Sequence, residues 1–145
     1  MRKLILASLL TVISSASLAA TISFPDYIVV QAVDGKAMAN SHQVTLQPGQ
    51  HLIELKLIED FSAGADDTNF IKSKPLYWSV NIKKDEDIQI STGEILSITE
   101  AEEFISSPVI TLNSVSIKNE SVSLVNHEQL MAIIMKQHSE MMINQ

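Results

Sequence analysis

The stretch Pro48-Gly49-Gln50-His51-Leu52-Ile53-Glu54-Leu55-Lys56-Leu57-Ile58 decides the fold class of this chain. Its first two residues are a turn signal, because proline presets φ and glycine accepts a positive φ. Side chains then alternate, with Ile53, Leu55 and Leu57 on one face of an extended segment and mostly charged residues on the other. This pattern indicates a half-buried β-strand that begins at a tight turn.

Neighbouring segments carry the same kind of signal and predict an antiparallel sheet. Residues 27–33 are rich in β-branched and aromatic side chains and end at the turn pair Asp34-Gly35. They continue a first strand region that starts at residue 21. We expect this region, a short strand at 43–46 and the strand at 51–58 to form a meander. An exposed loop is expected over 61–74. Further strands are expected at residues 76–82, 88–96, 109–112 and 121–125.

Two helices complete the expected fold. Thr99, with Glu102 three residues later, predicts a short helix over 99–104. Asn126 is typical of an N-cap, and the apolar spacing after it predicts a second helix over about residues 127–142. Because the strands follow one another through short turns, the fold class is mainly β: an antiparallel β-sandwich or open barrel with a C-terminal α-helix.

The first nineteen residues have the pattern of a bacterial secretory signal peptide. Arg2 and Lys3 precede an apolar run over 4–13, and small residues including Ser17 and Ala19 close it. The run is short for a membrane span. We therefore expect cleavage after Ala19 and a periplasmic location. Residues 1–19 are the signal peptide, and residues 20–145 form a single β-rich domain with no transmembrane segment.

The charge balance of the chain limits its partners. Seventeen acidic side chains oppose ten Lys and Arg, and loss of the leader leaves eight cationic residues and a net charge of −9. The single arginine, Arg2, lies in the leader. Nucleic acids and phosphorylated ligands favour cationic patches and guanidinium groups, so the composition argues against both.

Catalytic patterns are missing from the sequence. There is no cysteine, no Gly-x-Ser-x-Gly elbow and no phosphate or dinucleotide loop in a chain with four glycines. The sequence therefore predicts a protein that is not an enzyme, with no catalytic residues and no cofactor.

Three segments carry a resemblance to a known family. They are Val33-Asp34-Gly35-Lys36, Leu46-Gln47-Pro48-Gly49-Gln50-His51-Leu52-Ile53-Glu54-Leu55 and Lys72-Ser73-Lys74-Pro75-Leu76-Tyr77-Trp78-Ser79-Val80. With the leader, they resemble a family of bacterial periplasmic proteins of largely unknown function that includes an inhibitor of curli amyloid assembly. The resemblance covers residues 21–115 and implies fold and compartment. Family members are expected to have a longer C-terminal part, and no catalytic residues carry over.

A stripe of soft ligands on the last helix is the most unusual pattern. Thioether and imidazole groups can bind Cu(I), but methionine also fills gaps in cores and adaptable interfaces. The stripe steps by four, four, three and four residues along His127, Met131, Met135, His138 and Met142.

Two other clusters suggest metal ligands less strongly. His42 and His51 flank a predicted turn and could approach each other as zinc ligands. Carboxylates crowd the loop near Asp66 and Asp67, where calcium is conceivable but the spacing is not that of an EF-hand.

These observations predict an exported binding or regulatory protein of the Gram-negative envelope that modulates assembly of another exported protein. An exposed strand edge at Tyr27 and Val29 and the helix face at Met131, Ile134 and Met135 are the expected contact residues. The alternative is a periplasmic metal or small-ligand binding protein that uses the methionine–histidine stripe or the acidic loop.

Overall fold

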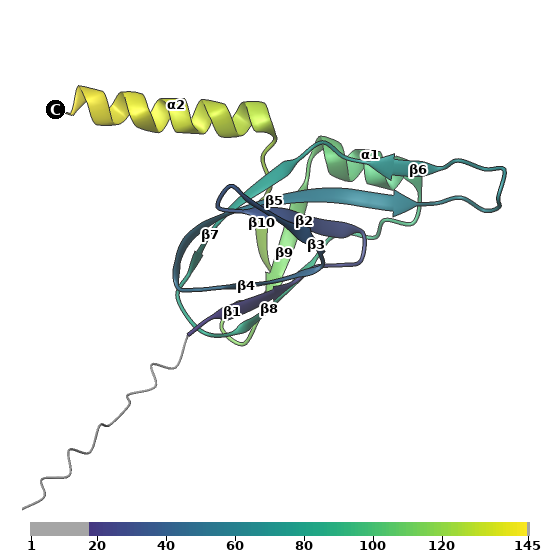
Figure 1. Ribbon diagram of the computed structural model, residues 1–145, viewed down its shortest axis with the longest axis horizontal. Coiled ribbons are helices and arrows are strands. Elements are labelled where there is room, and N and C mark those ends of the chain that lie inside the picture. The colour runs from purple at the N-terminus through teal and green to yellow at the C-terminus, as the bar shows by residue number, and fades with distance from the viewer. Residues whose placement is uncertain (1–17, 145) are drawn as a thin grey trace, which may run out of the picture.

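The computed structural model describes residues 18–144, which form two helices and two five-stranded sheets that curl into a half-barrel (Figure 1). Sheet A has the order β10 (Glu120–Ser123), β9 (Val109–Asn113), β8 (Asp87–Ser91), β1 (Ala20–Ser23) and β4 (Gln43–Leu46). Sheet B has the order β3 (Lys36–Ser41), β2 (Ile28–Val33) and β5 (Gly49–Asp60), and β5 pairs with both β6 (Phe70–Lys72) and β7 (Leu76–Ile82). The helices are α1 (Ile98–Ser106) and α2 (His127–Ile143). The predicted fold class is confirmed, and β1 with β8 is a parallel pair among antiparallel ones.

Strand β5 is the centre of sheet B, as its alternating sequence predicts. Ile53, Leu55 and Leu57 are fully buried. The strand is long enough to pair with β2 along one edge and with β7 and then β6 along the other. Between β6 and β7, the buried Ser73 hydroxyl accepts a hydrogen bond from the Leu57 N–H (2.9 Å) and donates to the Lys74 carbonyl (2.8 Å). Backbone groups at this junction are therefore satisfied inside the protein.

The predicted first strand region is two strands that belong to different sheets. Proline has no N–H to offer a ladder, so the chain breaks at Pro25. The Pro25 carbonyl accepts a hydrogen bond from the Ile28 N–H at 2.9 Å, and this turn sends β1 into sheet A and β2 into sheet B. The expectation of one continuous region is therefore wrong.

The predicted meander is also wrong in its pairing. Strand β2 pairs directly with β5, whereas β4 pairs with β1 in the other sheet. The intervening strand β3 was not predicted, since its sequence Lys-Ala-Met-Ala-Asn-Ser has little β-propensity and lies almost wholly exposed. The predicted turn at Asp34-Gly35, which joins β2 to β3, is confirmed. Asp34 (φ 52°) and Gly35 (φ 76°) both have positive φ, as a two-residue type I′ hairpin requires.

Helix α1 starts before the predicted position. Its N-cap is Ser97, whose hydroxyl accepts from the Glu100 N–H at 3.3 Å, and the Glu100 carboxylate accepts from the Leu96 N–H at 2.6 Å. Thr99 is therefore inside the helix. Ala101 and Phe104 are buried, so α1 covers one end of the core. The expected loop at 61–74 is confirmed only up to residue 69, where β6 follows.

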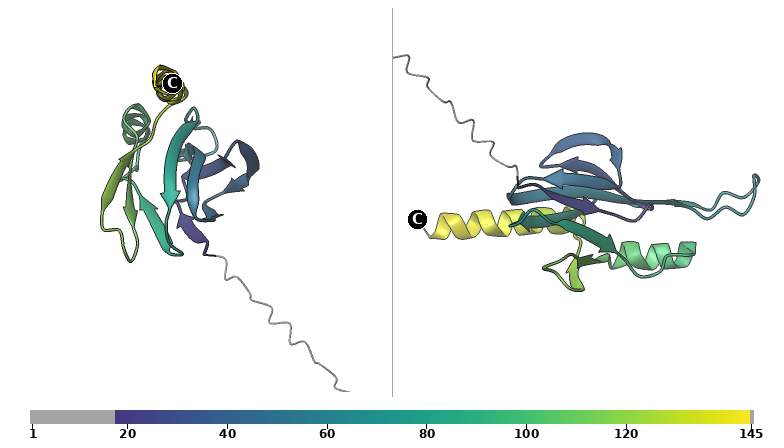
Figure 2. Two further views of the ribbon diagram at one scale, coloured as in Figure 1. Left: turned by 90° about the vertical axis from the view of Figure 1, so that its left-hand side faces the viewer. Right: turned by 90° about the horizontal axis from the view of Figure 1, so that it is seen from below.

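The core lies between the two sheets (Figure 2). Phe24 from the turn after β1 meets Trp78 of β7 edge-to-face, with ring centroids 6.4 Å apart and planes at 84°. The last buried core residue along the chain is Leu124, immediately before α2. Within residues 18–144, no helix combines the length and apolar character needed to cross a bilayer.

Candidate functional site

Helix α2 carries a row of large apolar side chains that the body leaves uncovered. None of its residues is buried. At 3.6 residues per turn, its large apolar side chains fall mostly within an arc of roughly 140°. We call this surface the α2 face. It is formed by Leu130, Met131, Ile134, Met135, Met141 and Met142. Met135 is 67 % exposed and Met142 66 % exposed, which is unusual for side chains of this size.

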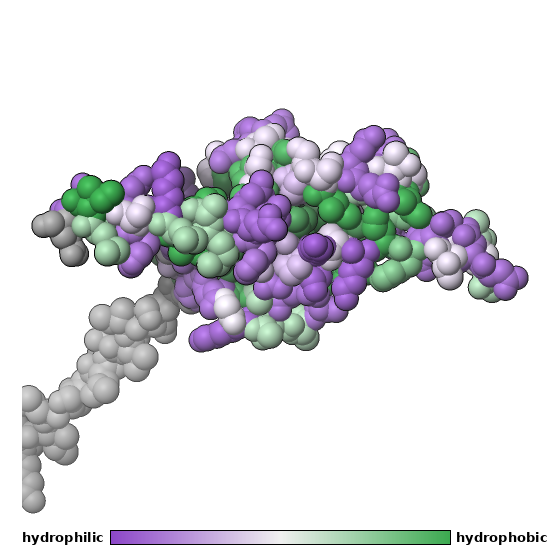
Figure 3. Space-filling view, turned by 90° about the horizontal axis from the view of Figure 1, so that it is seen from above, coloured by the Kyte–Doolittle hydropathy of each residue, from purple (hydrophilic) through white to green (hydrophobic). Residues whose placement is uncertain are grey.

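The helix is anchored to the body at its start and borders β7 across a hollow as far as Gln137. Asn126 and Gln129 form a capping box, because the side-chain oxygen of each accepts a 2.9 Å hydrogen bond from the backbone N–H of the other. The His127 ring lies 6.3 Å from the Tyr77 ring of β7. Beyond this anchor the helix projects past the sheets, with hydrophobic residues visible along it (Figures 1 and 3). The predicted helix and its Asn126 cap are confirmed.

The methionine–histidine stripe lies along this exposed helix. A straight helix rises 1.5 Å per residue, so the five side chains from His127 to Met142 are spread over roughly 22 Å. One ion cannot touch all five of them. The part of the chain that the structure describes contains no group of three or more His, Cys, Asp or Glu side chains that could hold a metal ion.

The strand segment expected to form a free edge is internal. Strand β2 has β3 on one side and β5 on the other, so its backbone offers no unpaired edge. Val29 is only 6 % exposed. The Tyr27 hydroxyl shares a hydrogen bond with Thr92 at 2.7 Å, and the Tyr27 carbonyl accepts from the Ile58 N–H at 2.9 Å. The expectation that this segment presents a free edge is therefore wrong, because the exposed β3 lies outside it.

A different pair of strands forms an open seam between the sheets. Strand β7 of sheet B and strand β10 of sheet A face each other, and the Tyr77 and Val125 backbones join them by reciprocal hydrogen bonds of 2.8 and 3.1 Å. Within the described residues this is their one bridge. Both strands are predicted from the sequence, but their proximity is not, because pairing between distant segments leaves no local pattern.

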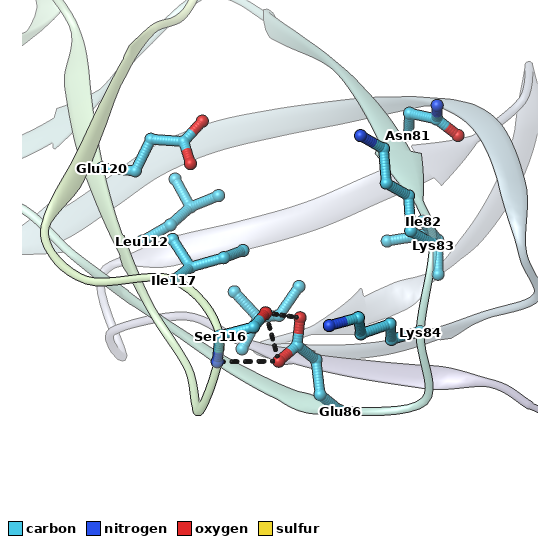
Figure 4. A pocket seen from close by; sticks show the side chains of 10 residues that line it. Asn81, Ile82, Lys83, Lys84, Glu86, Leu112, Ser116, Ile117 and Glu120 are labelled. Carbon is cyan, nitrogen blue, oxygen red and sulfur yellow. Dashed lines mark hydrogen bonds between the residues drawn. The ribbon is translucent and has the colours of Figure 1, made fainter.

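The far end of this seam is a hollow of about 310 Å³ (Figure 4). Asn81, Ile82 and Lys83 form one wall, and Leu112 and Ile117 face them from the other side. A second hollow, of about 350 Å³, lies at the helical end of the seam, between β7, Val122 and the start of the α2 face. Both hollows are mostly apolar, and neither was found from the sequence.

Glu86 lines one end of the hollow in Figure 4. Its carboxylate accepts two bonds from the Ser116 hydroxyl (2.7 and 2.9 Å) and a longer one from the Ser116 N–H. These bonds, with a smaller effect of Lys84, lower the pKa of the Glu86 carboxyl below its ordinary value. The Glu86 carboxylate therefore stays charged and is hydrogen-bonded to the loop between β9 and β10.

His51 is a structural cation and does not form a zinc site with His42. Its Nδ1 lies 2.7 Å from the Asp34 carboxylate and its Nε2 lies 2.7 Å from the Gln47 carbonyl. Both partners are acceptors, so both ring nitrogens must carry protons. These bonds raise the pKa of His51, and bonds from the Leu52 N–H and from His51 lower the pKa of Asp34. His42 instead contacts the Ile28 carbonyl through Nδ1 at 2.9 Å.

The carboxylates of the acidic loop are used within the loop. The Asp60 carboxylate accepts from the Ser62 N–H at 2.9 Å, and the Asp67 carboxylate accepts from the Asn69 side chain at 2.7 Å. The Phe61 N–H donates to the Asn69 carbonyl at 2.9 Å and closes the loop. The loop is thus held by its own hydrogen bonds.

Comparison with protein families identifies the group to which this fold belongs. Residues 21–141 match the family described as "Uncharacterized protein conserved in bacteria (DUF2057)". The chain belongs to this family. The DUF2057 match runs from the second residue of β1 into α2, so it includes both sheets, the seam and the helix up to Met141. No curated protein and no solved structure matches the chain.

Proposed function

We propose that this protein is an exported, non-enzymatic binding or regulatory protein of the bacterial envelope, which acts on the assembly of another exported protein. The observation that carries the proposal is the α2 face. A helix of seventeen residues without one buried side chain leaves large apolar groups to the solvent, and such patches mark contact sites on soluble proteins. The flexible thioethers of Met131 and Met135 can adapt to a partner surface.

The position of the first strand supports export. Ala20 is fully buried and pairs with Leu46, as the first residue of β1. Cleavage after Ala19 would leave all of β1 in place, so the proposed mature chain keeps every strand of both sheets.

The family resemblance suggests one class of partner. If the described activity of the curli assembly inhibitor extends to this chain, the partner is an exported amyloid subunit, and contact with the α2 face would compete with fibre growth. Thioflavin fluorescence of a purified curli subunit, with and without the protein, measures this. An unchanged lag time at equimolar protein would remove this class of partner.

The binding role is tested with matched helix variants. In the face variant, Met131, Ile134 and Met135 are all replaced by glutamine, which has a similar helix propensity to methionine. In the control variant, Lys136 and Glu140 on the opposite side are replaced by glutamine. Each tagged protein is incubated with periplasmic extract, and the captured partner is identified, purified and titrated by calorimetry. We expect the face variant to bind the purified partner at least about tenfold more weakly, and the control to bind as the wild type does. Equal affinities of the two variants would contradict the proposal.

A further inference from the structure

The seam between β7 and β10 exposes backbone groups whose directions can be derived. Backbone N–H and C=O groups of successive strand residues point alternately to the two edges of a strand. Because the groups of Tyr77 point to Val125, those of Ser79 and Asn81 point to the same outer edge of β7. Those of Trp78 and Val80 point to β5 instead.

The facing strand has the complementary arrangement. The Leu124 N–H donates to the Pro108 carbonyl at 2.8 Å, on the β9 side. By the same alternation, the groups of Ser121 and Ser123 point toward β7. Continued antiparallel pairing would join Ser79 to Ser123, but the described strands form no pair beyond Tyr77 and Val125. Two strand edges therefore face a common gap with unused donors and acceptors.

The walls of this gap fit an extended polypeptide. The hollow in Figure 4 reaches the buried side chains of Ile82, Ile88 and Leu112, and Ile117 lines its rim. A strand that pairs with the outer edge of β7 places alternate side chains toward this apolar floor and the others toward solvent.

Charge specifies the segment further. Lys83 and Lys84 follow β7 at this wall, and neither ammonium lies within ion-pair distance of a carboxylate in the described part of the chain. The nearby Glu86 carboxylate is held by Ser116. Lys84 acts on the Glu86 carboxylate, and Glu120 lies on the opposite wall of the hollow. Lys83 is therefore the cation beside the free strand edge, and it matches a segment with an acidic side chain next to it.

We infer that an extended segment of a partner polypeptide, with alternating apolar side chains and an acidic residue, adds as a strand to the β7 edge at Ser79 and Asn81 and fills the hollow beside β10. This inference rests on the proposed function, because it names the partner chemistry and a second contact besides the α2 face. Strand addition supplies affinity through the main chain and specificity through alternate side chains.

Hydrogen exchange measured by NMR on the full chain tests the site directly. The probe is a nine-residue peptide in which valine alternates with threonine and the central polar residue is aspartate. At saturating peptide, we expect the Ser79 and Asn81 amides to exchange at least about tenfold more slowly, while Trp78 and Val80, already paired with β5, are unchanged. Unchanged exchange at Ser79 and Asn81, with or without peptide bound elsewhere, overturns the inference.

Two variants separate backbone pairing from other causes. Asn81→Pro removes the outward N–H and leaves the β5 ladder intact, whereas Asn81→Ala keeps that N–H. We expect the proline variant to bind the peptide at least about tenfold more weakly and the alanine variant to bind within about twofold of the wild type. Equal binding by both variants overturns strand addition.

A charge swap provides a test that does not depend on the proline variant folding. The wild type should prefer the aspartate peptide over its lysine counterpart by about threefold, and Lys83→Glu should reverse the preference. If the preference does not reverse, the proposed charge match is overturned.

Two outcomes separate this inference from the proposed function. If the α2 face variant loses partner binding but the peptide does not protect the Ser79 and Asn81 amides, strand addition is rejected and the α2 contact stands. If these amides are protected but the face variant binds the partner fully, the α2 contact is rejected and strand addition stands.

Discussion

The double sheet and helix α2 are built from similar apolar side chains but use them differently. Ile53, Leu55 and Leu57 of β5 are fully buried, whereas Met131, Ile134 and Met135 of α2 are all at least 41 % exposed. The sheets are stabilised by pairing between strands that are distant in sequence, whereas the start of α2 is stabilised by its own capping box. The core of the body is thus formed without any buried side chain of α2, and the helix exposes most of its apolar surface.

The largest expected effect follows from removing a side chain at the centre of the body. Leu55 lies on β5, the strand between β2 and β7, and its side chain is fully buried. Leu55→Ala removes most of this side chain and leaves a cavity. We expect the free energy of unfolding in urea to fall by about 3 kcal/mol. A loss below about 1 kcal/mol would mean that the core is less tightly packed than this account requires.

The body could be predicted from its sequence only where the pattern is local. Strict alternation predicted β5 and β7, and turn chemistry predicted the hairpin at Asp34-Gly35. Strand β5 starts at Gly49, two residues before the predicted start at residue 51. The helix α2 was found because its cap and its spacing are both local signals. Such features depend on backbone preferences that one segment expresses alone.

Sheet membership and the seam could not be predicted in this way. The assignment of β4 to β1, and the parallel pairing of β1 with β8, depend on contacts between distant segments. Strand β3 lacks β-propensity and is held by its neighbour β2. The role of Asp34 as a partner of His51 likewise appears only when β2 and β5 lie side by side.

Removing the cap of α2 should weaken the helix and spare the body. Asn126→Ala deletes the acceptor for the Gln129 N–H and should cost about 1 kcal/mol of helix stability. We expect the helical circular-dichroism signal at 222 nm to weaken and the helical NMR chemical shifts of the first turn to be lost. The urea midpoint of unfolding, measured at β5 amides, should be unchanged. Asn144→Ala at the other end is the control. A parallel loss in the body would show that α2 and the sheets fold as one unit.

The Asp34–His51 pair should make the stability of the body depend on pH. The pKa of His51 is raised above its ordinary value of 6.5, so its contribution is complete below that pH and is lost as the pH rises through the raised value. The pKa of Asp34 is lowered from 3.8, so its contribution is present above that value and is lost as the pH falls through the lowered one.

The wild type should therefore exceed His51→Gln in stability most clearly between about pH 4 and 6.5, and the difference should shrink at higher pH. The effect is modest because Asp34 is partly exposed. Urea unfolding across pH measures it, with Asp34→Asn as the variant in which the pH-dependent part disappears. A difference that grows from pH 6 to pH 9 would contradict a protonated His51.

The smallest expected effect on stability is on the α2 face. Replacing Met131, Ile134 and Met135 by glutamine should change the free energy of unfolding of the body by no more than about 0.5 kcal/mol, since these side chains contribute nothing to its core. Urea unfolding followed at Trp78 fluorescence provides the measurement. A loss of 2 kcal/mol or more would place the helix in the folded core.

Photo-crosslinking in living cells tests most directly whether α2 is a contact surface. A photoreactive amino acid is placed at Met135 on the α2 face or at Lys136 on the opposite side, which are neighbours in sequence and similarly exposed. The account predicts a discrete adduct with another exported protein from position 135 and none from position 136. Equal labelling from both positions, or no adduct from position 135, would contradict it.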